Sequence, residues 1–148
     1  MSSNLPSVDI TDLATYLQKV DDIPSVSKMM GGVYLRDFIK GQDVAGQLLA
    51  KAIQADVRCK AKLDQAKAEA YLDRAADYLK QRSIKESSEA RKMYVDVDPD
   101  VIQAQENKAK TEALVSLMKN KLSVLRQAHD DLKKLLYGDN HMTGFDGM

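Results

Sequence analysis

One stretch of the chain constrains the fold more than any other, because it permits only a single long helix. Between Pro99 and Gly138 there is neither a proline nor a glycine, so nothing in the backbone interrupts a helix there. Asp98 is suited to cap the free amides at the start, and Pro99 suits the first helical position, where its missing N–H would be unpaired anyway. We therefore expect a helix that begins after Asp98, ends at Gly138 and is about 60 Å long.

Apolar residues recur along this stretch at steps of three and four, which is the pattern of a heptad seam. The seam is weak in its first turns, where Lys108 and Thr111 occupy it, and strong from Val115 onward. Its positions are Val101, Ala104, Lys108, Thr111, Val115, Met118, Leu122, Leu125, His129, Leu132 and Leu136. His129 on the seam favours a buried or register-setting histidine over a catalytic or metal-binding one. A seam of this length requires a second long helix, from this chain or from another copy.

A second long helix is predicted from Gln42 to about Arg82, after an interruption at Gly41. At about 100° per residue its apolar residues fall in two stripes on opposite sides, which indicates contacts on both sides. The first stripe, expected to pair with the helix after Asp98, consists of Ala45, Leu48, Ala52, Cys59, Leu63, Ala66 and Ala70. The opposite stripe, expected to be an oligomer interface, consists of Val57, Ala61, Ala68, Leu72, Ala75 and Leu79.

The remaining segments are expected to be short helices, connections and a tail. A short helix is predicted at about 10–20, followed by a breaker region at 21–32. The connection 83–97 is expected to hold a short helix with a capping box at Ser83, and then an extended or strand-like segment at 94–97. The fold class is thus all-α, with two long helices in an antiparallel hairpin, short N-terminal helices and an oligomeric helical assembly. The predicted organisation is residues 1–41 as short helices and hinge, 42–138 as the hairpin core and 139–148 as a flexible tail.

Composition argues against several classes of function. Lys+Arg and Asp+Glu number 22 each, so the net charge is +0, which disfavours strong non-specific binding to polyanions but permits a local basic face. We expect neither a signal peptide nor a membrane span, and a single cysteine fits a reducing cytoplasm. Cys59 is expected to be an inert thiol. The acidic run 96–100 lacks the glycine of a calcium loop, so we predict no metal. Signals of an enzyme are nearly absent elsewhere in the sequence, and we predict neither catalysis nor a cofactor.

Basic residues on the second helix are the one candidate site. Arg58 and Lys62 lie on one strip between the apolar stripes, and Lys60, Lys67 and Arg74 lie on the other. One interpretation is a solvated helix face with charge partners one turn away. The other is contact with the phosphates of a nucleic-acid strand, since basic groups two turns apart are about 10 Å apart and can follow a backbone without reading bases. The nearest rings for base stacking are those of Tyr71 and Tyr78.

The segment 60–64 (KAKLD) resembles the basic Lys-Ala-Arg-Leu-Asp segment of the UvsY-type recombination mediator proteins of phages. The order of elements is also similar, because a basic stretch at 85–94 precedes an acidic turn at Asp98, and a long C-terminal helix follows. The resemblance covers roughly residues 45–137. Lys62 stands where the family has an arginine, and the aromatic residues that follow in the family are absent here.

The resemblance implies a helical protein that assembles into a ring-like homo-oligomer and binds single-stranded DNA. Such a mediator helps to load a RecA-like recombinase onto strands covered by single-strand-binding protein, and it has no catalytic activity. Lys60 and Lys62 carry the family's basic motif, and Arg58, Lys67 and Arg74 join them through their positions on the helix. The alternative is a structural module, such as a virion component, adaptor or scaffold, whose long helices serve assembly without nucleic acid.

Overall fold

The computed structural model describes residues 9–23 and 28–146, with side chains described up to residue 138. These residues are helical apart from short turns and contain no strand, which confirms the all-α prediction. None of their helices is long and apolar enough to cross a membrane. Residues 1–8 lie outside the described residues, as do residues 24–27 of the predicted breaker region. The elements are α1 (Thr11–Asp21), α2 (Lys28–Glu69), the π-helical segment η2 (Ala70–Arg74), α3 (Ala75–Gln81), α4 (Ser88–Val97) and α5 (Pro99–Asp146).

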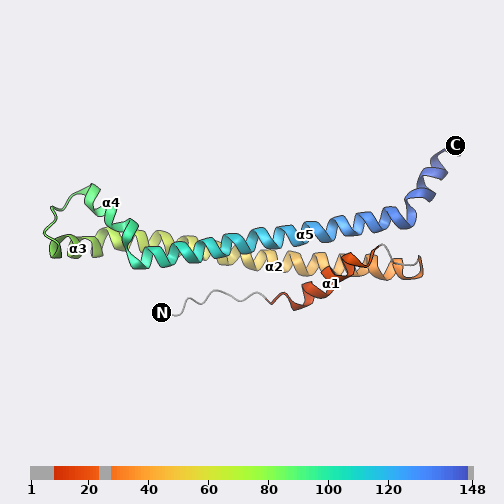
Figure 1. Ribbon diagram of the computed structural model, residues 1–148, viewed down its shortest axis with the longest axis horizontal. Coiled ribbons are helices and arrows are strands. Elements are labelled where there is room, and N and C mark those ends of the chain that lie inside the picture. Colours follow the sequence, from red (N-terminus) through yellow and green to blue (C-terminus); the bar gives the residue numbers. More distant parts are fainter. Residues whose placement is uncertain (1–8, 24–27, 147–148) are drawn as a thin grey trace. The chain divides into compact units, whose positions relative to one another are not determined.

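The chain divides into two compact units, and α2 and α5 contribute to both. Unit 1 holds residues 52–115, and unit 2 holds the described residues before 52 and after 115. Within each unit a segment of α2 packs against a segment of α5 (Figure 1). The two segments run antiparallel, as the contacts below show.

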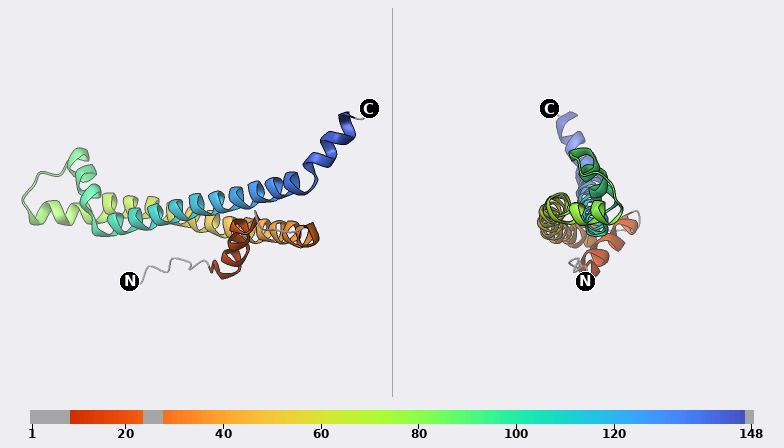
Figure 2. Two further views of the ribbon diagram at one scale, coloured as in Figure 1. Left: turned by 45° about the vertical axis from the view of Figure 1, so that its right-hand side comes forward. Right: turned by 90° about the vertical axis from the view of Figure 1, so that its left-hand side faces the viewer.

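In unit 2, α1 lies beside the first half of α2 (Figure 2). An ion pair between Lys19 and Asp37 joins the two helices, and the side chain of Tyr16 lies against Gly41. The N-terminal helix predicted at about 10–20 is therefore confirmed as α1. The core of this unit consists of Leu13, Phe38, Ala45, Leu48, Met118, Leu125, Ala128, Leu132 and Leu136.

The second long helix begins at Lys28, well before the predicted start at Gln42, and its glycines lie within it. Their positions explain the difference. A Cβ at Gly31 would overlap the side chain of Leu136, and a Cβ at Gly41 would lie 2.9 Å from the Cβ of Tyr16. No described glycine has a positive φ. Gly31 and Gly41 therefore permit neighbouring helices to approach α2 closely. In the sequence alone, the same glycines favour a helix break.

In unit 1 the heptad seam of α5 faces α2, as predicted. Val101 and Thr111 are buried, and Lys108 is half-buried. The polar seam positions have a partner: Asp56 of α2 accepts hydrogen bonds from Lys108 Nζ at 2.8 Å and from Thr111 Oγ1 at 2.7 Å. The first turns of the seam thus exchange apolar packing for a charged pair, which fixes the register of the two helices.

The connection between the long helices differs from the prediction in two places. Its helix is capped by Ser87, whose side chain accepts a hydrogen bond from the Ala90 amide at 3.1 Å, and not by Ser83. The segment 94–97, predicted to be extended, is the last turn of α4. A tertiary contact explains this difference. In its helical conformation Tyr94 of α4 packs its ring on that of Tyr78 in α3, with ring centroids 4.7 Å apart.

The C-terminal helix begins as predicted and ends later than predicted. Asp98 caps it as expected, because its side chain accepts a hydrogen bond from the Val101 amide at 3.1 Å. α5 does not stop at Gly138 but continues to Asp146. Gly138 lacks the positive φ that would end a helix there.

The close approach at Gly41 generates a test of unit 2. Gly41→Ala places a methyl group 2.9 Å from the Tyr16 Cβ and 3.2 Å from the Leu125 Cδ1. We expect the free energy of unfolding to fall by about 1–2 kcal/mol, because overpacking outweighs the gain in helix propensity. Urea unfolding followed by circular dichroism measures this change.

Gly46→Ala on the same helix is the matched control, because nothing lies within 4 Å of the added Cβ. We expect it to stabilise the protein by about 0.5–1 kcal/mol. Equal stabilisation by both substitutions would contradict the packing of α1 and α5 against Gly41.

Candidate nucleic-acid interface

Four of the five predicted basic residues are exposed on α2 in unit 1, as two pairs on opposite flanks of the helix that we together call the basic row. The basic row consists of Arg58, Lys60, Lys62 and Lys67. None of the four makes an ion pair within 4 Å among the residues that the structure describes. Between residues 57 and 68 the only carboxylate is that of Asp64. A chain with no net charge therefore presents a local excess of unpaired positive charge on this helix.

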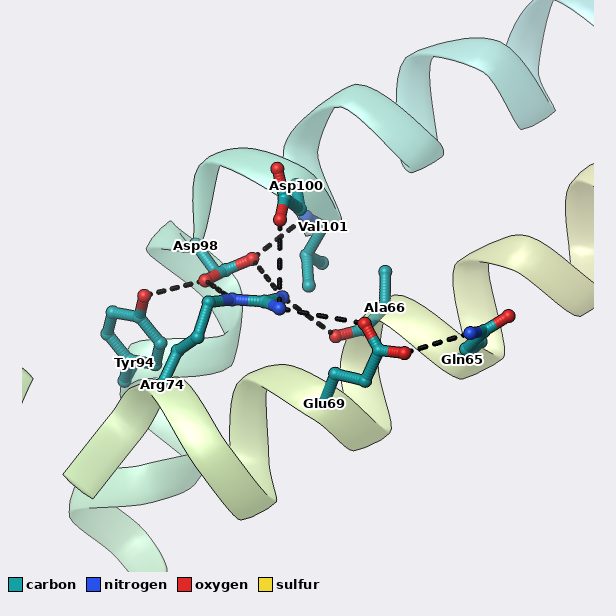
Figure 3. A network of polar contacts seen from close by, with 8 residues as sticks. All are labelled: Gln65, Ala66, Glu69, Arg74, Tyr94, Asp98, Asp100 and Val101. Atoms are coloured by element: carbon teal, nitrogen blue, oxygen red, sulfur yellow. Dashed lines mark hydrogen bonds and ion pairs between the residues drawn. The ribbon is translucent and has the colours of Figure 1, made fainter. Parts of the chain in front are cut away.

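The fifth basic residue, Arg74, lies in an internal network of unit 1 (Figure 3). Its guanidinium makes a bidentate pair with Asp98, through Nε to Oδ1 and Nη2 to Oδ2, both at 2.8 Å. Nη2 also donates to the Ala66 carbonyl at 3.2 Å, and the carboxylates of Glu69 and Asp100 lie 3.7 Å and 3.6 Å from Nη1. The N–H donors of Arg74 thus have partners within the chain, and Arg74 is not part of the exposed basic row.

Asp98 is fully buried and is the centre of this network. Besides Arg74, the Tyr94 hydroxyl donates to it at 2.6 Å and the Val101 amide donates at 3.1 Å. The hydrogen bonds from Arg74, helped by those from Tyr94 and Val101, lower the pKa of Asp98 to about 2, against the effect of its burial. Burial, reinforced by the hydrogen bond to Asp98, raises the pKa of Tyr94. The carboxylate is therefore ionised over the whole range of physiological pH.

The π-helical segment η2 explains why Arg74 leaves the basic row. On a uniform α-helix Arg74 follows Lys60 and Lys67 at intervals of two turns and shares their face. A π-helical turn holds one extra residue, which changes the direction of the side chains by up to about 100° from its last residue, Arg74, onward. Arg74 is therefore directed toward Asp98.

The same rotation divides the predicted oligomer interface. Ala75 and Leu79 are buried, and Ala75 belongs to a core cluster with Ala70, Tyr94 and Val101. These two positions serve folding within the chain. The other four stay outside and form the exposed apolar stripe, which consists of Val57, Ala61, Ala68 and Leu72.

Reasoning from the sequence missed this network, although one signal for it exists. The inward-facing apolar residues of the second helix are four apart from Ala66, which is half-buried, to Ala70, five apart from Ala70 to Ala75, and four apart again from Ala75 to Leu79. A single step of five in such a stripe marks an inserted residue. A helical wheel with a uniform 100° per residue omits this inserted residue, so it places Arg74, Ala75 and Leu79 on the wrong faces of the helix.

The exposed apolar stripe lies between the two halves of the basic row. Val57 is 63% exposed and Leu72 is 64% exposed. On the helix, Arg58 and Lys62 flank the stripe on one side, while Lys60 and Lys67 flank it on the other. The opposite face of α2, which carries Ala52 and Ala55, is buried. The outward face of this helix is thus apolar along its middle and basic along both edges.

The two candidate stacking tyrosines differ in availability. The Tyr78 ring makes two contacts within the chain: it packs against the Tyr94 ring, and the Arg82 guanidinium lies 4.4 Å from its centroid. Tyr71 is half-buried, and its hydroxyl donates to the Ser88 Oγ at 3.3 Å. Tyr71 is therefore the ring that remains beside the basic row.

Other candidate chemistry is sparse in the described part of the chain. Cys59 is a half-buried free thiol, and the ring of His129, also half-buried, lies 3.4 Å from a carboxylate oxygen of Asp130. No group of three or more potential metal ligands occurs among the described residues.

The chain matches no protein-family model, no curated protein and no solved structure with which it was compared. The functional argument therefore rests on the residues of unit 1.

The Asp98 network predicts acid sensitivity. Because the pKa of Asp98 is held near 2 in the folded chain and returns to about 3.9 on unfolding, its contribution to stability is present above about pH 4. That contribution is lost as the pH falls toward 2. Asp98→Asn retains a capping side chain but loses the charge, and we expect it to lower the free energy of unfolding by about 2 kcal/mol near neutral pH.

Urea unfolding of both proteins at several pH values checks this expectation, and the difference between them narrows as the pH falls from 4 to 2. Asp100→Asn is the control, because that side chain is 74% exposed and contributes little through solvent. If the two substitutions cost the same at neutral pH, Asp98 does not have the assigned role.

Proposed function

We propose that this protein is a non-enzymatic accessory protein that binds single-stranded DNA as a homo-oligomer, in the manner of a phage recombination mediator. The observation that carries the proposal is the basic row: four exposed cations on one helix segment, without ion-pair partners, in a chain whose net charge is +0. The other arginine and lysine side chains of unit 1 that pair with carboxylates are Arg74, Arg91 and Lys108. Lys85, Lys92 and Lys110 of unit 1 are also exposed without an ion pair among the described residues, but the basic row gathers four such cations within ten residues of one helix.

The spacing of the basic row suits a flexible strand. Lys60 and Lys67 are two turns apart, about 10 Å along the helix, and Arg58 and Lys62 are about 6 Å apart. Phosphates of a single strand can adjust to such spacings because its backbone torsions are free, whereas a rigid duplex presents fixed ones. Four contacts on a neutral chain give weak binding by one copy.

Assembly of several copies would make that weak binding useful. The exposed apolar stripe gives α2 an outward surface on which another copy can pack, and each added copy contributes its own basic row to the same strand. The family resemblance adds the role of a ring-like oligomer in the host cytoplasm of a phage, which helps to load a RecA-like recombinase onto strands covered by single-strand-binding protein. No membrane enters this role.

A second candidate is a helical assembly protein without a nucleic-acid role, such as a virion component, adaptor or scaffold. The observation that favours it is the same apolar stripe, since Val57 and Leu72 are each more than half exposed. The two candidates agree on assembly and differ only in what the basic row does.

Substitution of the basic row tests the first candidate. In fluorescence anisotropy with a labelled single-stranded oligonucleotide, Lys60→Ala combined with Lys62→Ala should weaken binding. It should also lower the slope of log affinity against log salt by up to about 0.7 per lost phosphate contact, measured between about 50 and 200 mM salt.

Lys110→Ala combined with Lys119→Ala is the matched control, because both lysines are exposed on α5 and the change in charge is the same. We expect this control to bind almost as the parent does. If the parent shows no binding near physiological salt, or if both double variants lose affinity equally, the helical assembly protein becomes the better description.

Substitution of the apolar stripe tests assembly. Val57→Glu combined with Leu72→Glu places charge in the contact, so light scattering should show a smaller assembly while circular dichroism shows unchanged helix content. Met93→Glu combined with Leu135→Glu alters two side chains that are 72% and 58% exposed elsewhere and should leave the mass unchanged. A parent protein that is monomeric at micromolar concentration rules out assembly through this stripe.

A further inference from the structure

A hollow of 570 Å³ opens on unit 1 beside η2, next to one end of the basic row. Its lining includes Lys67, Tyr71 and Leu72 from the long helix and Lys92, Val95 and Asp96 from α4. The two sets of residues are brought together by the fold-back of α4, since about twenty residues separate them in the sequence. The volume lies within the usual range for small-ligand sites, about 300–1,000 Å³.

The hollow has two chemically different parts. Tyr71, Leu72 and Val95 supply ring and aliphatic surface, while Lys67 and Lys92 are exposed cations with no ion-pair partner among the described residues. Asp96 supplies an exposed carboxylate that can accept a hydrogen bond. A ligand that matches both parts needs a flat apolar body, an anionic group and an N–H donor on its edge.

The ring of Tyr71 is held in place before any ligand arrives. Its hydroxyl donates to the Ser88 Oγ at 3.3 Å, and the Arg91 guanidinium lies 5.6 Å from the ring centroid. Arg91 also donates to the Tyr71 carbonyl at 3.2 Å. These contacts attach α4 to η2, and the π-helical turn sets the orientation of the ring. A ring that is already ordered loses little entropy when a ligand packs on it.

We propose that this hollow binds one nucleotide of a DNA strand, with the base against Tyr71 and Val95 and a flanking phosphate between Lys67 and Lys92. Asp96 accepts a hydrogen bond from an N–H on the edge of the base. This proposal rests on the proposed function and deepens it: the basic row follows the backbone, and the hollow adds contact with a base. Lys92 on α4 thereby joins the nucleic-acid interface.

Photocrosslinking and one charge substitution test the hollow together. An oligonucleotide that carries 5-iodouracil should crosslink to the parent within the tryptic peptide 68–74, which contains Tyr71, because trypsin cleaves after Lys67 and Arg74. Lys92→Ala should weaken binding of the same oligonucleotide by about fivefold or more. Lys85→Ala is the matched control, because Lys85 is also exposed but lies outside the hollow, and it should have a much smaller effect.

An abasic oligonucleotide of equal length separates the hollow from the basic row. The hollow predicts weaker binding of the abasic strand, and this preference should shrink in Lys92→Ala. If the parent binds DNA but crosslinks elsewhere, binds the abasic strand equally well and tolerates Lys92→Ala as it tolerates Lys85→Ala, the hollow is overturned while the basic row stands. If the parent binds neither strand, the proposed function and the hollow both fail.

Discussion

The pair formed by the buried Asp98 and the half-buried Arg74 connects the parts of unit 1. A buried carboxylate is costly unless its charge and its lone pairs are satisfied, and Asp98 meets that condition with donors from three places: Arg74 in η2, the Tyr94 hydroxyl in α4, and the Val101 amide at the start of α5. The fold-back of α4, the start of α5 and the turn in the long helix therefore share one electrostatic centre. Packing alone would not fix their positions, because the core beside them includes two alanines, Ala70 and Ala75.

The π-helical segment connects this centre to the surface. One extra residue in η2 turns Arg74 inward, where its charge is neutralised, while Lys67, before the segment, stays outside with its charge unpaired. The same turn buries Ala75 and leaves Leu72 exposed. A single change of helical phase thus separates the residues that hold unit 1 together from those that remain available to a strand or to another copy. Such segments are often found at functional sites for this reason.

The parts of the fold that followed from the sequence are those governed by local rules. The cap at Asp98, the heptad seam of α5 and the inner stripe of α2 each depend on residues within a few turns of one another, and all three were predicted. Among the site residues, exposure of the basic row followed from the same wheel. The predictions that are wrong concern residues with distant partners. Gly41 favours a break in the local pattern but lies against Tyr16 in the fold, and Tyr94 favours an extended segment but contacts Tyr78 and Asp98 from a helix.

Local chemistry alone thus specified an all-helical chain with one long uninterrupted helix, an apolar face on each long element and a cluster of positive charge between residues 57 and 68. Which charges stay free is a different matter, because it depends on whether a carboxylate from elsewhere in the chain reaches them. Arg74 and Lys67 are both positively charged and occupy equivalent positions on a uniform wheel. The folded chain brings Asp98 to one of them and no carboxylate within ion-pair distance of the other, since helix phase beyond η2 is set by packing against α4 and α5, and not by the periodicity of the sequence.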